Sequence, residues 1–447
     1  MHRKQSILIW LTLLVPLAAC PQQPLNTNTT DEQTYTLYIN QDWDGLIELG
    51  QEALAMGIDF YYLHVRIGIA WYEKKNYHKA LGHFNKAHSI NQDDPYLLEY
   101  LYYTNLFLLR RQEARLVARR MTPRQRRELG IRDDMWVESV EVSFQGNQAH
   151  DATDVNGFFE SGSVNATDGS QFISTGHRFV GLYMVHPVSP KLSIYHGFAH
   201  MHKEHAVFSR VNNQTFTNEN TYSNLKQYYI SGVTRITRSL MLITSFHAIN
   251  IRYPVETTIT RGVNTMVVSS MESLTDFAGC LSLYAHIGNI TLGGSIHAAG
   301  LNNKRQVQGD GTIAWYPLGN MNLYAVSVVS FQSESALTEN RNNRQVVFQR
   351  IGLRVANPLW VEGYASLGEM QNFLRSDALV VYNSMNAINR QLGAKMIFQL
   401  TQHIHTSFSY TFAQHESLFI PEAPGMQPTN ALPYNSHSLN AGLVWTF

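Results

Sequence analysis

From residue 136 to its end, the chain repeats one pattern, in which short segments alternate apolar and polar side chains. The last segment shows it clearly, because one face carries Leu439, Ala441, Leu443, Trp445 and Phe447 while small or polar residues occupy the other. Successive side chains of a strand point to opposite faces, so this period of two predicts strands with one apolar face.

Fourteen such segments follow one another along the chain. Their cores are Trp136–Phe144, Gly176–His186, Lys191–His202, Leu225–Ile236, Leu240–Arg252, Thr275–Ile287, Ile290–Gly300, Val307–Tyr316, Met321–Phe331, Val346–Val355, Leu359–Met370, Arg390–Leu400, His403–Phe412 and Ser438–Phe447. An even number of amphipathic strands is typical of a bacterial transmembrane barrel. Because an open edge cannot remain in lipid, we expect the last strand to pair with the first.

The connections between these segments alternate in length. Six are short, namely "PVSPK", "TRS", "GN", "PLGN", "NP" and "TQ", whereas the connections between them are mostly long and polar. Outer-membrane barrels have short periplasmic turns and long outside loops. The pattern therefore places both ends of the barrel domain, residues 135–447, on the periplasmic side.

Charged and polar positions within the strands predict the lining of the barrel. A charge on the lipid face near the bilayer midplane costs about 2 to 4 kcal/mol, and the charged residues avoid that face wherever the alternation is clean. We expect six residues to line the lumen, namely Arg350, Arg354, Glu362, Lys395, His403 and His405.

The histidines raise the question of metal binding or catalysis. His200 and His202, or His403 and His405, stand two positions apart on one strand face, but no third or fourth ligand follows from the spacing. The hydroxyl of Ser407 beside His405 suggests a hydrolase, but no oxyanion motif or orienting acid accompanies it. We therefore predict no metal, no cofactor and no enzymatic activity.

The amino terminus, "MHRKQSILIWLTLLVPLAAC", has a basic start, an apolar run and small residues, which is the order of an export signal. We assign residues 1–19 to this signal. The last four letters resemble the lipobox of bacterial lipoproteins, which implies that Cys20 carries a lipid and that residues 20–30 form a lipidated linker. Cys280 is the only other cysteine, so acylation of Cys20 excludes a disulfide framework.

Residues 31–121 have a helical pattern that repeats with a period of 34 residues. Small or bulky residues stand at six spaced positions, namely Gly68, Trp71, Tyr77, Ala80, Phe84 and Ala87. This spacing resembles the tetratricopeptide repeat (TPR), although Gln92 replaces the usual proline and Gly50 replaces a bulky residue. The resemblance implies two and a half to three repeats that grip a periplasmic protein; the alternative is a spacer.

A basic segment lies between the helical pattern and the strands. Eight arginines occur between Arg110 and Arg127, and Pro123 marks a break in the helix, so we assign residues 122–134 to a basic linker. The favoured interpretation is a solvated helix face. The alternative places the guanidinium groups near phosphate headgroups at the inner face of a membrane.

The composition narrows the possible functions. The formal charge is zero and charged residues make up only 15%, so nothing favours nucleic acid. The architecture resembles bacterial proteins that couple periplasmic TPR repeats to an outer-membrane barrel, including exopolysaccharide export porins. Leu443, Trp445 and Phe447 resemble the terminal signal by which the outer-membrane assembly machinery recognises such barrels. We expect a translocation pore for a polar polymer or solute, or else a non-conducting anchor that recruits partners; an outer-membrane hydrolase is the third hypothesis.

Overall fold

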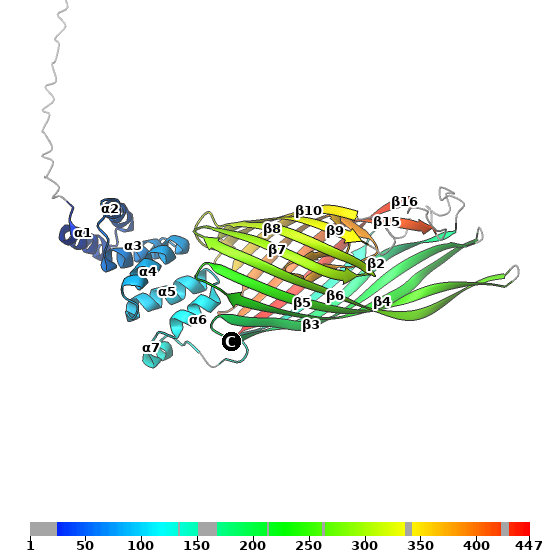
Figure 1. Cartoon of the computed structure of the whole chain (residues 1–447), viewed down its shortest axis with the longest axis horizontal. Helices are drawn as coiled ribbons and strands as arrows, with labels where there is room; N and C mark the ends of the chain where they lie inside the picture. Colours follow the sequence, from blue (N-terminus) through cyan, green and yellow to red (C-terminus); the bar gives the residue numbers. More distant parts are fainter. Residues whose placement is uncertain are drawn as a thin grey trace, which may run out of the picture.

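The computed structural model describes residues 25–132, 135–150, 168–211, 214–261, 264–335, 342–421 and 429–447. The predicted export signal and Cys20 lie outside these ranges. In the described chain, helices come first and antiparallel strands follow (Figure 1). No described helix has the length and hydropathy needed to cross a membrane.

The helices form three antiparallel pairs and a short seventh helix. They are α1 (Thr27–Ile39), α2 (Trp43–Ala55), α3 (Tyr61–Glu73), α4 (Tyr77–Ile90), α5 (Pro95–Phe107), α6 (Arg111–Ala118) and α7 (Pro123–Glu128). The first helices of the pairs begin at Thr27, Tyr61 and Pro95, which are 34 residues apart, as are the starts of the second helices. The helix α7 falls inside the predicted linker, where Pro123 occupies the first turn that proline tolerates.

The central pair shows why the 34-residue pattern needs its small residues. A Cβ atom added to Gly68 on α3 would lie 2.5 Å from the ring of Phe84 on α4, so only glycine permits this close crossing. Ala80, Phe84 and Ala87 are fully buried between the helices. Trp71 and Tyr77 are partly buried and pack around the same core.

Fourteen strands close into an antiparallel barrel, which confirms the predicted fold. They are β1 (Ser139–Ala149), β2 (Gly169–Ser189), β3 (Leu192–Val211), β4 (Gln214–Arg235), β5 (Leu240–Arg261), β6 (Asn264–Ile287), β7 (Ile290–Leu301), β8 (Lys304–Trp315), β9 (Leu323–Ser335), β10 (Asn342–Ala356), β11 (Leu359–Met370), β14 (Ala387–Gln399), β15 (Ile404–Pro421) and β16 (Thr429–Thr446). The last strand pairs with the first as expected, with Trp445 opposite Val140 and Leu443 opposite Val142.

Two features of the strands differ from the prediction. The strands β2 to β6, β15 and β16 continue well beyond their predicted cores and extend the wall at the end opposite the helices (Figure 1). Two further short strands, β12 (Phe373–Arg375) and β13 (Val380–Tyr382), form a separate two-stranded sheet where a simple loop was expected. We call the end of the barrel with the short connections the turn end and the opposite end the loop end.

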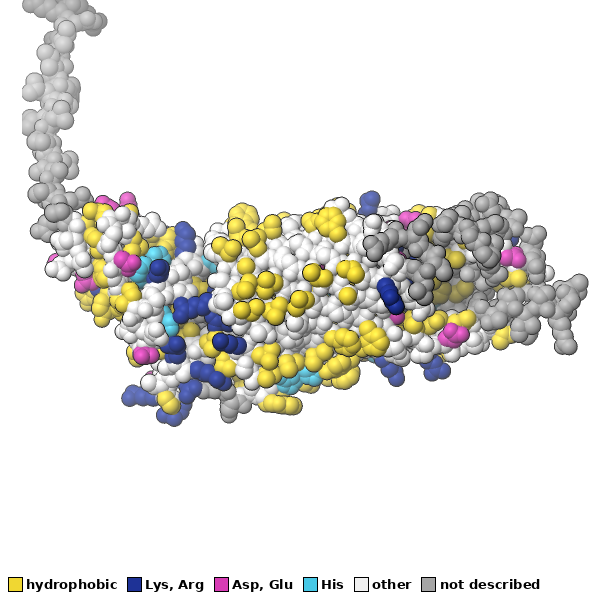
Figure 2. All heavy atoms as spheres, viewed as in Figure 1, with side chains coloured by type: hydrophobic (Ala, Val, Ile, Leu, Met, Phe, Trp, Pro, Cys, Tyr) yellow, Lys and Arg dark blue, Asp and Glu magenta, His cyan; other side chains and the backbone are white. Residues whose placement is uncertain are grey.

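The outer wall of the barrel is apolar. On β6, Phe277, Leu281 and Leu283 are 50%, 52% and 44% exposed, whereas the intervening Cys280 and Ser282 are buried. Figure 2 shows hydrophobic side chains spread along the barrel wall, whereas Lys and Arg gather where the helices meet the barrel. Such an apolar surface on an even-stranded closed sheet is the construction of a transmembrane β-barrel.

A candidate lumenal site closed at both ends

The hairpin formed by β12 and β13 lies inside the barrel. It leaves the wall after Met370 at the loop end and returns at Ala387. Its tip, Asp377, contacts Tyr284, which is three positions from the turn end of β6 at Ile287. The hairpin therefore descends through most of the lumen rather than projecting outward.

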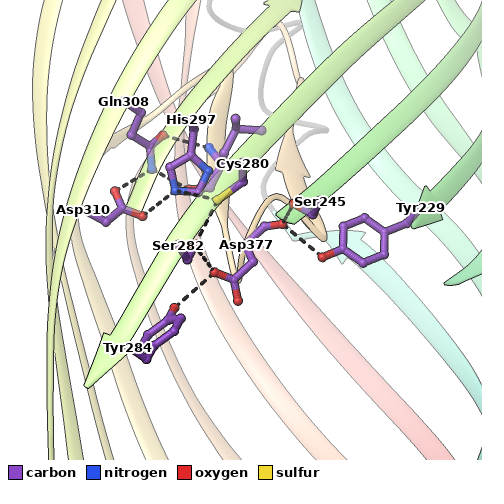
Figure 3. A network of polar contacts seen from close by, with 10 residues as sticks. Tyr229, Ser245, Cys280, Ser282, Tyr284, His297, Gln308, Asp310 and Asp377 are labelled. Carbon is purple, nitrogen blue, oxygen red and sulfur yellow. Dashed lines mark hydrogen bonds and ion pairs between the residues drawn. The ribbon is translucent and has the colours of Figure 1, made fainter. Parts of the chain in front are cut away.

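The tip of the hairpin is held by three neighbouring strands (Figure 3). The Asp377 carboxylate accepts hydrogen bonds from the Ser282 hydroxyl (2.5 Å) and the Tyr284 hydroxyl (3.1 Å) on β6. The Asp377 backbone carbonyl accepts from Tyr229 on β4 (3.0 Å) and Ser245 on β5 (2.5 Å). Four donors from the wall thus converge on one residue.

The stem of the hairpin is held by side-chain amides. The Gln308 amide on β8 donates to the Leu374 carbonyl (2.7 Å) and its oxygen accepts from the Leu374 N–H (3.1 Å), as a paired strand would. At the base, the Asn372 side chain donates to Glu334 on β9 (2.7 Å), and the Asn372 backbone carbonyl accepts from the Gln332 side chain (2.7 Å). The wall thus satisfies polar groups that the lumen would otherwise bury unpaired.

The hairpin also packs against the wall. Leu374 and Ala378, which are 1% and 0% exposed, join Ala278 and Cys280 in an apolar cluster. The tip residues Ser376, Asp377 and Ala378 have φ angles of 55°, 54° and 64°, a left-handed conformation that costs non-glycine residues energy. The contacts of the tip offset this cost.

A cavity of about 390 Å³ remains between the hairpin and the opposite wall. Its lining includes four basic residues, Lys203, Arg350, Arg375 and Lys395, but a single acidic residue, Glu362. Glu362 is 4.0 Å from the Arg350 guanidinium and lies opposite Lys395 across the strand pair. One carboxylate thus serves two cations.

The charges at the base of the hairpin contrast with those of the cavity. Glu334 contacts Lys304 (3.5 Å) and Arg344 (3.4 Å), and Arg344 also pairs with Glu369 (2.5 Å). This cluster contains two acidic and two basic groups and is balanced. The base of the hairpin thus lacks the excess of positive charge that the cavity has.

The structure distributes the six predicted lumen residues unevenly. Arg350, Glu362 and Lys395 line the cavity. Arg354 lies nearer the turn end, where its guanidinium donates to the Asn357 carbonyl (2.6 Å) and stacks on the Trp360 ring. His405 occupies an inward position of β15, but His403 precedes the strand and hydrogen-bonds the Thr446 carbonyl (2.9 Å) in the turn.

The helix α6 lies against the mouth of the barrel at the turn end. The buried Gln112 side chain donates to the lumen-facing Ser193 hydroxyl on β3 (3.3 Å) and the Val233 carbonyl on β4 (2.7 Å). The Glu138 carboxylate, in the segment that enters β1, accepts hydrogen bonds from Arg111 (3.3 Å) and Arg115. We call the docked helices α4 to α6 the cap.

Further charged groups join the cap to the connection between β4 and β5. Glu113 pairs with Arg110 (3.3 Å) within α6 and with Arg235 (3.2 Å) on the barrel. Arg110 also donates to the Arg238 carbonyl. Arg110, Arg111 and Arg115 thus hydrogen-bond the barrel rim, which neither interpretation of the basic segment included, and Arg111 also remains 43% exposed.

The start of α4 contacts the rim on another side, between β8 and β9. The backbone N–H of His78 donates to the Gly319 carbonyl (3.1 Å), and the Asn320 side chain donates to the Lys75 carbonyl (2.9 Å). Burial, together with the nearby Arg110 and His286, lowers the pKa of His78 to about 4. His78 is therefore neutral near pH 7, and the cap spans the mouth from β1 to the β8–β9 turn.

One cluster inside the barrel has the residue types of a catalytic relay. The Nε2 atom of His297 lies 2.9 Å from the Asp310 carboxylate and 3.8 Å from the Cys280 sulfur (Figure 3). A nucleophile relay uses the two different ring nitrogens, whereas here both contacts fall on one nitrogen. The cluster packs under the hairpin, and the arrangement suits a structural role.

The other candidate chemistry does not assemble either. His200 and His202 lie on the outer face of β3, in register with Val180 and Arg178 of β2. In the described residues, no group of three or more His, Cys, Asp or Glu side chains is placed to hold a metal ion. Within the same ranges, no hydrogen bond joins His405 to Ser407.

Sequence reasoning missed Lys203, Arg375 and Asp377. Lys203 follows the predicted end of its strand, and the other two lie in a segment interpreted as a loop. A signal was present, because Phe373, Leu374 and residues 379–382 are apolar. A solvent-exposed loop has no reason to carry two such runs.

The sequence matches no family model and no curated protein. Solved structures with a similar barrel include the Pseudomonas putida toluene transporter TodX, with a TM-score of 0.44 and 8% identity over 70% of this chain and 90% of that one. The Ralstonia pickettii toluene transporter TbuX gives 0.43 and 9% over 69% and 90%. A Pseudomonas aeruginosa FadL homologue gives 0.42 and 8% over the same shares.

Likeness of this degree carries no argument about substrate. The class is defined by the molecule itself: a closed fourteen-stranded barrel with an apolar exterior, a polar lumen and a helical cap at one end.

Proposed function

We propose that this protein is an outer-membrane translocation pore, closed in this conformation, that passes a polar solute carrying negative charge. The observation that supports this most is the cavity lined by Lys203, Arg350, Arg375 and Lys395, whose lining holds one acidic residue, Glu362, with Glu141 near Lys395. Partly buried cations in excess of carboxylates are costly in a barrel that serves only as an anchor. A passing carboxylate or phosphate would supply the missing negative charge.

The hairpin and the cap are the two closures of this pore. The hairpin occupies one side of the lumen, and removing it would join the cavity to the space along β4 to β8. The cap lies across the mouth that faces the periplasm if the short connections are periplasmic turns. Movement of both closures would open a continuous path.

The helical array recruits the partner that moves the cap. Its three helix pairs keep the 34-residue period of the TPR family, whose concave face binds peptides. We propose a periplasmic protein partner at this face, with acylated Cys20 tethering the amino terminus to the inner leaflet. In the same way, Leu443 and Trp445 on β16, with Phe447 directly after it, present the signal for the outer-membrane assembly machinery, and deletion of Phe447 is expected to lower outer-membrane levels.

Planar-bilayer recording tests the pore. The full-length protein is compared with a hairpin-free variant, in which a short glycine and serine linker joins Asn372 to Asn383. The linker can be short because Phe373 and Tyr382 are paired, so the residues beside them are close together. We expect little current from the parent and stable, anion-selective channels from the hairpin-free variant. In that background, Lys395→Gln should reduce the anion selectivity, whereas Lys226→Gln on the outer face of β4 should not.

If the hairpin-free variant carries no current, even with the cap loosened by Glu138→Gln, the proposal that the protein is a pore is overturned. The protein would then be a non-conducting anchor that recruits envelope partners. The tight packing of Leu374 and Ala378 against the wall is the observation that favours this second candidate. A correctly folded barrel must be shown for both variants by its heat-modifiable migration on gels.

A further inference from the structure

A groove of about 900 Å³ runs along the outer face of the wall formed by β1 to β3, β11 and β14 to β16. Small residues form its floor, namely Gly146, Ala394 and Ala441. Its sides are the larger apolar residues Phe144, Val180, Met396, Phe408, Tyr410 and Leu439. The groove is therefore a hollow in the lipid-facing surface.

The register of the strands explains the hollow. Gly146 on β1 lies between Leu439 of β16 and Arg178 of β2. No atom comes within 4 Å of a Cβ atom added at Gly146, so the space beside it is open. A larger side chain at this position would fill the groove without disturbing the barrel.

One end of the groove is basic. Arg178, His200 and His202 belong to its lining, and Lys226 lies directly opposite His200 on the next strand. Arg178, His202, Asn224 and Arg252 lie opposite one another across the neighbouring strands β2 to β5. Arg178 is 82% exposed, and its described acidic contact is the half-exposed Glu204 at 3.6 Å.

The depth of this basic cluster is fixed by its place along the strands. Arg178 is eleven positions from the turn end of β2 at Ser189, and Arg252 is twelve from the start of β5 at Leu240. A tilted strand crosses the hydrocarbon in about 9 to 11 residues. The cations therefore lie at the headgroup level of the leaflet nearer the loop end, and the apolar groove lies within the hydrocarbon.

From this arrangement we infer that the groove is a specific site for a phosphate-bearing lipid. The acyl chains lie on Gly146, Ala394 and Ala441, and the phosphate accepts hydrogen bonds from Arg178, with Lys226 and Arg252 beside it. Charge-assisted contacts of this kind are strong where water is scarce. The inference depends on the membrane placement proposed above but not on whether the barrel conducts.

Native mass spectrometry of the full-length protein in mild detergent tests the site. Bisphosphorylated lipid A is the probe, and the same lipid without phosphates and inorganic phosphate are the comparisons. We expect one tightly bound lipid A, with affinity about tenfold lower in Arg178→Gln/Arg252→Gln, since a bond to a charged group contributes about 1.5 to 3 kcal/mol. Gly146→Leu should lower the affinity similarly by filling the groove.

Two matched variants control for general effects on the outer surface. Arg305→Gln removes an exposed arginine ten positions from the turn end of β8 at Trp315, and Gly294→Leu adds a side chain in open space on β7. Neither should change lipid binding. Equal affinity for the dephosphorylated lipid, competition by inorganic phosphate alone, or equal losses in the control variants would each overturn the site.

The proposal of lipid binding and the proposal of conduction can be overturned independently of each other. If the hairpin-free variant carries no current but the bisphosphorylated lipid still binds at Arg178, the pore is overturned and the lipid site is supported. If the barrel proves not to reside in a membrane, both fail together.

Discussion

The two closures of the barrel are built from different interactions. At its tip and stem, the hairpin is held by hydroxyl, amide and carbonyl groups, and its one charged tip residue, Asp377, has neutral partners. The cap is held by three ion pairs, of Glu138 with Arg111 and Arg115 and of Glu113 with Arg235, together with hydrogen bonds such as those of Gln112. Salt weakens ion pairs to the extent that water reaches them, as it reaches the 43% exposed Arg111 side chain, whereas it affects buried neutral hydrogen bonds far less. The cap is thus the closure that solution conditions and partners can release.

The largest effect should come from excising the hairpin between Asn372 and Asn383. Cys280 is 8% exposed and packs beside Leu374 and Ala378, so it should become reactive toward a polar maleimide when the hairpin is absent. We expect labelling of Cys280 to accelerate by about a hundredfold or more, as for a group freed from a closed core. Peptide mapping assigns the label to Cys280.

Excision of the hairpin should leave the cap in place. Hydrogen exchange of α6 is expected to remain slow in the same variant, because its contacts with Ser193, Val233 and Glu138 involve no hairpin residue. Loss of α6 protection would show that the two closures form one cooperative unit.

The cap should respond next to Glu138→Gln. This change leaves Arg111 and Arg115 without their carboxylate, which should weaken docking by about 2 kcal/mol, the contribution of hydrogen bonds to a charged group. Hydrogen exchange of α6 should accelerate and lose most of its dependence on salt. Glu128→Gln, which breaks an exposed pair with Arg124 on α7, should change nothing measurable.

Much of this architecture could be predicted from the sequence because lipid and close packing impose strict local rules. A lipid-facing strand must alternate, so Leu443 and Trp445 reveal their face without knowledge of their neighbours. The crossing of α3 and α4 demands Gly68 opposite Phe84, which makes the 34-residue period visible. These features depend on residues close in sequence.

The closures could not be predicted in the same way. The bonds of the hairpin join Asp377 to Tyr229 and Ser282, across separations of 148 and 95 residues. The strands β12 and β13 contain three residues each, too short for a reliable alternation. Likewise, the cap requires Arg115 to meet Ser193, and no local pattern records how two finished domains dock.

A smaller change at the hairpin tip should follow from Asp377→Ala. It leaves the Ser282 and Tyr284 hydroxyls without their acceptor and places alanine at a φ of 54°, which should favour hairpin release by about 2 kcal/mol. Asp377→Asn keeps an acceptor and tolerates the left-handed conformation, so it should have a smaller effect. Labelling of Cys280 measures both, and equal rates in the two variants would contradict this account of the tip.

The smallest effect should be a loosening of the cap in mild acid. The pKa of His78 is about 4 in the folded protein, below its ordinary value of 6.5, because burial and Arg110 disfavour its charged form. The neutral ring therefore stabilises docking fully above pH 6.5, and this contribution is lost as the pH falls toward 4. Exchange of the His78 amide, which binds the Gly319 carbonyl, should accelerate at pH 5 after correction for intrinsic rates.

Two variants on α4 separate this response from a general loosening of the helix. His78→Gln should keep docking but remove its dependence on pH, since glutamine does not titrate. His83 also has a pKa lowered to about 4 by burial and by His64, but it packs within the helical array rather than on the barrel. His83→Gln should therefore retain the acid response at the His78 amide, and its loss there would show that the array itself, rather than its contact with the barrel, is the sensitive element.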